Sequence, residues 1–113
     1  MRYPAAYLKM LDTKECSLKI LTIENLSYLS EGDEHAFFKW LNSIKSVQSF
    51  SGVGSALEIS VSENVPDNDL REFIALFFRY SADLRQLSIF KTRENSSWFI
   101  ENPNAYWAKE LSE

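Results

Sequence analysis

The chain has 113 residues and a formal net charge of −4, from 12 Lys and Arg against 16 Asp and Glu. Apolar residues make up 45 % and charged residues 25 % of the chain, which are ordinary globular proportions, and the length suits one globular domain over residues 1–113. The acidic balance argues against nucleic-acid binding through phosphate contacts, and no apolar run approaches the roughly 20 residues that span a membrane.

The cysteine content and the N-terminal sequence bear on location. Cys16 is the only cysteine, so the chain cannot form an internal disulfide and does not require an oxidising compartment. The start, Met1 to Pro4, leads into no apolar core of signal-peptide length. We therefore expect a cytoplasmic protein that makes no membrane contact.

The first elements in chain order are a strand and a helix. Residues 18–23 are apolar and β-branched, which is typical of a strand covered on at least one face. Ser30 and the acidic residues after it favour a helix start, so we expect an amphipathic helix over about 33–44. Its apolar positions at helical spacing are Phe37, Trp40, Leu41 and Ile44. Residues 1–15 would add a short helix or an edge strand.

A hairpin comes next. Strands are predicted at 47–50 and 57–61, on either side of a turn at 51–55 that contains two glycines. Apolar and polar residues alternate cleanly in the second of these strands, so one of its faces is expected to be buried and the other wet.

The second helix has the strongest periodic signal in the chain. It is predicted to start at Pro66, with Asp69 and Glu72 at the spacing of a capping box. Leu76 and Phe78 widen its apolar face, which implies contacts with the C-terminal segment or with another chain. The residues expected on its inward face are Leu70, Phe73, Ile74, Phe77 and Tyr80.

The C-terminal part completes the predicted fold. Residues 87–90 are expected to form a fourth strand, and short helices should carry Trp98 and Phe99 and then residues 105–111. The element order β-α-β-β-α-β is that of the ferredoxin-like α+β fold. Right-handed crossovers would give a four-stranded antiparallel sheet in the order 4-1-3-2, with both long helices on one face.

The inventory of reactive residues argues against an enzyme. His35 is the only histidine, so zinc sites that need several His and Cys ligands are excluded, and no phosphate-binding glycine loop is present. Asp67 and Asp69 flank Asn68, but the glycine and the final glutamate of a calcium loop are missing. We predict no catalytic residue, no cofactor and no metal site.

Acidic residues are expected to gather at the two ends of the sheet. Carboxylates at helix starts stabilise a helix by about 0.3 to 1 kcal/mol each, which accounts for part of this pattern. The rest would form an electronegative patch that attracts a basic partner. One group is Glu24, Glu31, Asp33 and Glu34, and the other is Glu63, Asp67, Asp69, Glu72 and Glu94.

Aromatic residues are the second clue to a binding function. The chain has three Trp, and Trp98, Tyr106 and Trp107 fall in short C-terminal helices that cannot enclose all of them. These residues would either cover an open side of the fold or anchor an interface, where Trp and Tyr are enriched.

The second half of the chain resembles small acidic bacterial proteins, some of which act as immunity proteins of toxin–immunity pairs, including contact-dependent growth inhibition systems. The resemblance covers about residues 57–109 and implies a protein that binds a cognate toxin; many such toxins are nucleases with basic clefts. It carries over no catalytic residue. The matching segments are Asp69–Tyr80, Asp83–Leu87, Trp98–Phe99 and Tyr106–Trp107.

The leading hypothesis is therefore a cytoplasmic immunity or inhibitor protein, monomeric, that neutralises a cognate protein toxin. The alternative is a homo-oligomeric structural or adaptor module with Leu76, Phe78 and the C-terminal tryptophans between copies. A regulatory domain that binds a small molecule is the third reading. The residues predicted to contact the toxin are Glu63, Asp67, Asp69, Glu72, Glu94, Trp98, Tyr106 and Trp107.

Overall fold

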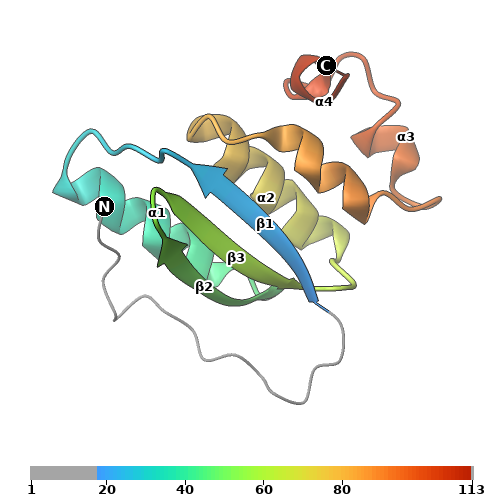
Figure 1. The fold of residues 1–113 in the computed structure, drawn as a ribbon. Helices are drawn as coiled ribbons and strands as arrows, with labels where there is room; N and C mark the ends of the chain where they lie inside the picture. The colour runs from blue at the N-terminus through green and yellow to red at the C-terminus, as the bar shows by residue number, and fades with distance from the viewer. Residues whose placement is uncertain (1–17, 113) are drawn as a thin grey trace.

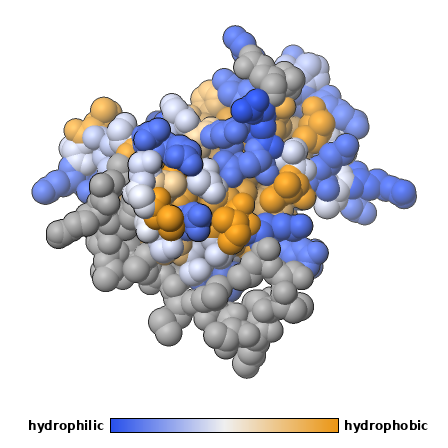
Figure 2. All heavy atoms as spheres, in the orientation of Figure 1, coloured by the Kyte–Doolittle hydropathy of each residue, from blue (hydrophilic) through white to orange (hydrophobic). Residues whose placement is uncertain are grey.

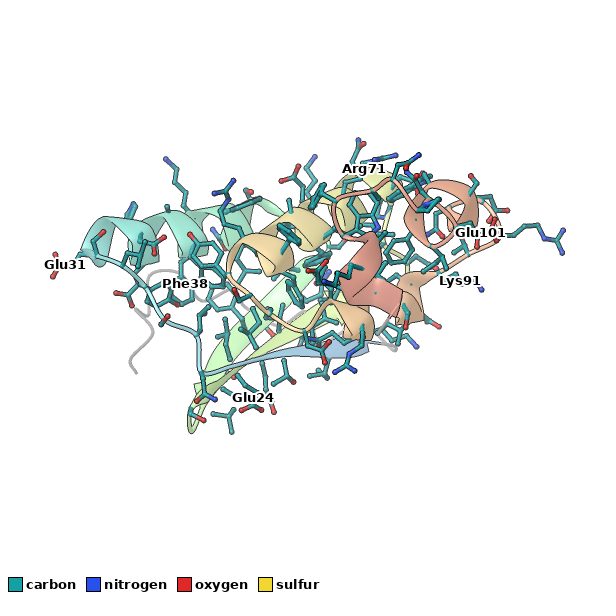
Figure 3. All side chains as sticks on the ribbon, turned by 90° about the horizontal axis from the view of Figure 1, so that it is seen from above. Glu24, Glu31, Phe38, Arg71, Lys91 and Glu101 are labelled. Carbon is teal, nitrogen blue, oxygen red and sulfur yellow. The ribbon has the colours of Figure 1, made fainter. Side chains whose placement is uncertain are left out.

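The computed structural model describes residues 18–112, and the prediction for residues 1–15 falls outside that range. An antiparallel sheet carries two long helices on one face (Figure 1), as a view from above also shows (Figure 3). No helix within the described range is long and apolar enough to cross a membrane. The elements are β1 (Leu18–Glu24), α1 (Glu31–Ser43), β2 (Val47–Val53), β3 (Ala56–Ser62), α2 (Asp67–Arg79), the 3-10 helix η2 (Leu84–Phe90), α3 (Ser96–Phe99) and α4 (Ala108–Ser112).

The sheet has three strands in the order β1-β3-β2, and both pairings are antiparallel. The turn of the hairpin contains Gly54 at φ +60°, a left-handed conformation that glycine adopts without steric cost. The inward side chains alternate along β1 and, as predicted, along β3. In β2 the buried Val47 and Phe50 are three positions apart, because the register with β3 shifts between Val47 and Ser49. The side chains of the sheet that reach the core are Leu21, Ile23, Val47, Phe50, Leu57, Ile59 and Val61.

The predicted four-stranded, ferredoxin-like sheet is wrong. Residues 87–90, expected to be a strand, belong to η2, in which Leu84, Leu87 and Phe90 are buried. A 3-10 helix has three residues per turn, so this spacing of three places all of them on one side. Ile89, which a period of two would have buried with Leu87, stays 49 % exposed.

The side chain of Gln86 lies where a fourth strand would have paired with β1. Its Oε1 accepts a hydrogen bond from the backbone N–H of Thr22, and its Nε2 donates one to the Thr22 carbonyl, both at 2.8 Å. One amide side chain thus satisfies both backbone groups of Thr22, and it also donates to the carbonyl of Asp83. This contact blunts part of an edge that would otherwise be open to pairing.

The two long helices start in different ways. Ser30 caps α1, since its Oγ accepts a hydrogen bond from the backbone N–H of Asp33 at 3.1 Å. The predicted capping box of α2 is wrong, because Pro66 is the N-cap and no side chain caps it. Asp69 instead accepts hydrogen bonds from Ser46, from the backbone N–H at 3.0 Å and from Oγ at 2.5 Å. This carboxylate ties α2 to the connection between α1 and β2.

The apolar face of α2 is buried on two sides. Leu70, Phe73 and Phe77 are fully buried, and the rings of Phe73 and Phe90 stack at 6.4 Å with 9° between their planes. Leu76 is fully buried as well, so it cannot lie between copies of the chain. The wide apolar face therefore meets the C-terminal segment, which was one of its two predicted partners.

The short C-terminal helices extend the helical layer instead of covering the open side of the sheet (Figure 1). Trp107 is only 7 % exposed, and its Nε1 donates to the carbonyl of Phe99 at 2.9 Å. Among residues 18–112, no element lies over the other face of the sheet. The face drawn in Figure 2 has separate apolar groups between hydrophilic side chains.

The contact between Gln86 and β1 can be tested by substitution. Gln86→Ala should lower the free energy of unfolding by about 1 to 3 kcal/mol, because both backbone groups of Thr22 lose their partner. Urea denaturation measures this effect. Ser88→Ala, an exposed position in the same helix, is the control and should change stability by less than about 0.5 kcal/mol. Equal effects of both substitutions would contradict the role of Gln86.

Candidate partner-binding surface

Two of the residues predicted to contact a partner hold the fold together. Asp69 is engaged by Ser46, and Trp107 is buried with its indole N–H bonded to the backbone. Substituting either one would disturb packing or leave a polar group unsatisfied. Trp107 is therefore not available for contact with a partner, and Oδ2 of Asp69 is occupied by Ser46.

Glu63 and Glu94 lie at the end of the molecule where α2 begins, and both are exposed. Positive charges share this end: Lys91 lines the same shallow pocket as Glu63, and Arg93 precedes Glu94 in the chain. Figure 3 places Lys91 and Glu101 at the opposite end of the molecule from Glu31. The end with Glu63 therefore has mixed charge.

The other four predicted contact residues lie along the outer side of α2. The indole N–H of Trp98 donates to Asp67 at 3.3 Å, and Glu72 accepts a hydrogen bond from Trp40 at 2.7 Å. Tyr106 is 53 % exposed. The structure thus brings Asp67, Glu72, Trp98 and Tyr106 onto one side of the molecule.

A groove of about 580 Å³ opens on this side, and we call it the aromatic groove. Phe78 is 40 % exposed there, and its ring meets that of Tyr106 edge to face at 5.0 Å. In the sequence Trp40 is one of the apolar positions at helical spacing, a pattern that does not reveal the groove. Its lining residues are Trp40, Ala75, Phe78, Arg79 and Tyr106.

The first group of predicted carboxylates consists of Glu24, Glu31, Asp33 and Glu34. Together with Leu29, these residues form what we call the acidic end. Glu24, Leu29 and Asp33 line one polar depression of about 420 Å³, and Glu31 and Glu34 belong to the first turn of α1 beside it. No Lys or Arg occurs between residues 20 and 38 of the sequence. Arg79, from the end of α2, lines the same depression and partly balances these carboxylates.

Leu29 projects from the acidic end and is 96 % exposed. A leucine just before a helix cap often packs on the fourth helical residue, but here that residue is Glu34. The backbone N–H of Leu29 donates to Asp33 Oδ2 at 2.8 Å, so the main chain is fixed while the side chain meets solvent. The sequence already shows a charged residue, Glu34, at the position where an apolar partner for Leu29 would stand.

The backbone around the depression is strained at two positions. Asn25 has φ 53° and Ser81 has φ 60°, and both line the same depression as Glu24. Asn tolerates the left-handed region better than most residues, whereas Ser at such φ costs free energy that surrounding contacts must offset. The N–H of Asn25 donates to the carbonyl of Ser55 at 3.1 Å, which holds this bend in place.

Tyr80 connects the two long helices at this depression. Its hydroxyl donates to Asp33 Oδ1 at 2.8 Å, so the end of α2 is tied to the start of α1. Burial, and then the hydrogen bond with Asp33 and its charge, raise the pKa of Tyr80 from 10.0 to about 12. The phenol therefore stays protonated and keeps its bond at neutral pH.

Within residues 18–112, no group of three or more His, Cys, Asp and Glu side chains comes close enough to hold a metal ion. Comparison of the chain with protein-family models, with curated proteins and with solved structures gave no match. The resemblance to immunity proteins accordingly stays a prediction from the sequence.

The bond between Tyr80 and Asp33 predicts a pH dependence of stability. The folded chain keeps a proton up to pH about 12 that the unfolded chain releases near pH 10, so this contribution to stability is complete below pH 10 and declines above it. We expect the unfolding free energy to fall more steeply from pH 10 to pH 12 in the wild type than in Tyr80→Phe. Urea denaturation across this range tests it, and parallel curves would count against it.

Proposed function

We propose that this protein is a non-catalytic, cytoplasmic binding protein that neutralises a cognate protein toxin by covering a basic surface on it. The acidic end is the part of the molecule that carries this proposal. There, Leu29 is 96 % exposed on a fixed loop and is accompanied by Glu24, Glu31, Asp33 and Glu34. Protein interfaces commonly place apolar contacts inside a polar, solvent-accessible rim, and Leu29 with the carboxylates around it could form such a contact.

Charge supports a basic partner. The full chain has a net charge of −4, and the acidic end groups four carboxylates, with Arg79 as the cation that lines their depression. Such a field attracts a positively charged surface and accelerates its capture. The nucleic-acid cleft of a nuclease is one surface of this kind, because it is built to bind phosphates.

The acidic end and the aromatic groove form one continuous surface. Arg79 lines both the polar depression and the groove, so the two share a wall at the end of α2. A partner centred on this wall would contact Leu29 on one side and Phe78 and Tyr106 on the other. Charged groups would then orient the partner while apolar groups supply contact area.

The surface is held by the fold before any partner arrives. Ser30 and Asp33 fix the loop that carries Leu29, and Tyr80 joins the two helices beneath it. Trp40 is oriented by its hydrogen bond to Glu72. A preformed surface loses less conformational entropy on binding, which favours tight inhibition.

The exposed aromatic pair Phe78 and Tyr106 favours one second candidate, a homo-oligomer that buries the aromatic groove between copies. Light scattering of the purified chain at micromolar concentration separates the two. A monomer excludes the oligomeric module, whereas a dimer that Phe78→Ser dissociates would support it.

Charge reversal tests the role of the acidic end. Glu31→Lys together with Glu34→Lys should lower the association rate with the toxin about 10-fold or more at low salt, since long-range attraction is lost. The probe is the product of the gene adjacent to this one, co-expressed and then measured by surface plasmon resonance. Glu63→Lys with Glu94→Lys makes the same change in net charge at the other end and is the matched control.

The outcomes separate the surfaces. A loss with the first pair alone supports the acidic end, and a loss with the control pair alone assigns contact to the residues predicted from the sequence. Failure of the wild-type chain to copurify with the adjacent gene product, or to protect cells from it, would overturn the proposed function.

Substitution of Leu29 separates an effect on binding from an effect on stability. Leu29→Ala should leave the unfolding free energy within about 0.5 kcal/mol of the wild type, because the side chain is 96 % exposed. The same substitution should weaken binding of the toxin about 10-fold, as expected for an interface anchor. Unchanged affinity would remove Leu29 from the contact surface.

A further inference from the structure

Two tryptophans lie on opposite sides of α2 in matching arrangements. Trp98 donates its indole N–H to Asp67, and Trp40 donates its indole N–H to Glu72, at 3.3 and 2.7 Å. Both carboxylates belong to α2, and each fixes the orientation of its indole ring. A carboxylate beside an aromatic ring favours a cation placed over that ring.

At Trp98 the cation is present. The guanidinium carbon of Arg71 lies 3.8 Å from the centroid of the Trp98 ring, which is a cation–π contact. Arg71 is drawn on the side of α2 that faces away from the sheet (Figure 3). The chain thus contains one complete set made of an indole, a carboxylate and a guanidinium.

At Trp40 the third member is missing from the described part of the chain. No Lys or Arg between residues 18 and 112 lies over the Trp40 ring, and none of them forms an ion pair with Glu72. The space beside Trp40 is the aromatic groove, whose wall includes the small side chain of Ala75. The groove therefore has room for a cationic side chain that residues 18–112 do not supply.

The remaining walls suit a long cationic side chain. Burial, followed by the charge of Glu72, raises the pKa of Tyr106, whereas the charges of Arg71 and Arg79 lower it. Glu72 and these two arginines are therefore all near enough to Tyr106 to influence it electrostatically. Phe78 and Tyr106 offer apolar ring surface for methylene groups. Arg79 is the charged residue in the lining of the groove and repels a cation, so the cation is expected at the Glu72 end, about 10 Å along the helix from residue 79.

We propose that the aromatic groove is the receptor for an arginine side chain of the protein partner, with its guanidinium stacked on Trp40 beside the Glu72 carboxylate. Arginine is favoured over lysine because a planar guanidinium stacks on an indole, as Arg71 does on Trp98. The inference rests on the proposed function, since it names the chemistry by which the partner engages one part of the surface.

The experiment follows the indole N–H signals of Trp40, Trp98 and Trp107 by NMR, each assigned by Trp→Phe substitution. The probe is N-acetyl-L-arginine amide, which represents arginine within a polypeptide, and N-acetyl-norleucine amide is the uncharged control. Arginine amide should shift the Trp40 signal with saturation in the millimolar range, whereas norleucine amide should shift it at least 5-fold less.

Two variants sharpen the test. Glu72→Gln keeps an oxygen that accepts the Trp40 hydrogen bond but removes the charge, so the response at Trp40 should weaken at least 5-fold. Arg71→Ala uncovers the Trp98 ring beside Asp67 and should create a second responding signal at Trp98. Circular dichroism checks that both variants are folded.

Three results would overturn the proposal: no saturable shift at Trp40, an equal shift with norleucine amide, or an unchanged response in Glu72→Gln. Free L-arginine that binds 100-fold tighter than the blocked amide would also overturn it, because the groove would then be a small-molecule site. These measurements need no partner, so their failure is distinct from a failure of the chain to bind its toxin.

Discussion

The burial of α2 on two sides is the constraint on which the rest of this structure depends. Its apolar face packs on the sheet, and its flank packs on η2, where Phe73 stacks on Phe90. The outer side of α2 faces solvent, and it carries Arg71, Glu72, Phe78 and Arg79, with Ala75 partly exposed between them. The proposed surface is built on this side because the helix beneath it cannot turn without exposing several fully buried rings.

Polar side chains then fix the loops around this helix. Asp69 holds the connection before β2, Asp33 holds both the loop of Leu29 and the hydroxyl of Tyr80, and Gln86 holds the edge of β1. Each contact joins segments that are far apart in sequence or closes a helix start. The result is a surface whose charged and aromatic groups have defined positions, which lowers the conformational entropy that the surface would lose on binding a partner.

The hydrogen-bond partners of two carboxylates in α2 could not be predicted from their spacing in the sequence. Asp69 and Glu72 have the spacing of a capping box, yet one bonds Ser46 and the other bonds Trp40. A pattern along the chain records which groups are neighbours on a helix, but not which partner from another helix arrives within hydrogen-bond distance. The partners of Asp69 and Glu72 could therefore be known only once the segments that contain Ser46 and Trp40 were placed beside α2.

Sequence alone determined the two long helices, the hairpin and the inward positions Leu70, Phe73, Ile74 and Phe77 of α2, because periods of 3.6 and 2 are local properties of the chain. It also indicated two groups of carboxylates and the excess of aromatic residues. Tertiary structure decided the conformation of residues 84–90. Their apolar pattern is compatible with a strand and with a 3-10 helix, and the hydrogen bonds between Gln86 and the edge of β1 form only in the helical arrangement. Tertiary structure likewise decided which aromatic side chains stay exposed, since Trp107 is buried and Phe78 is not. Burial of that kind depends on contacts between segments distant in sequence, which no local pattern contains.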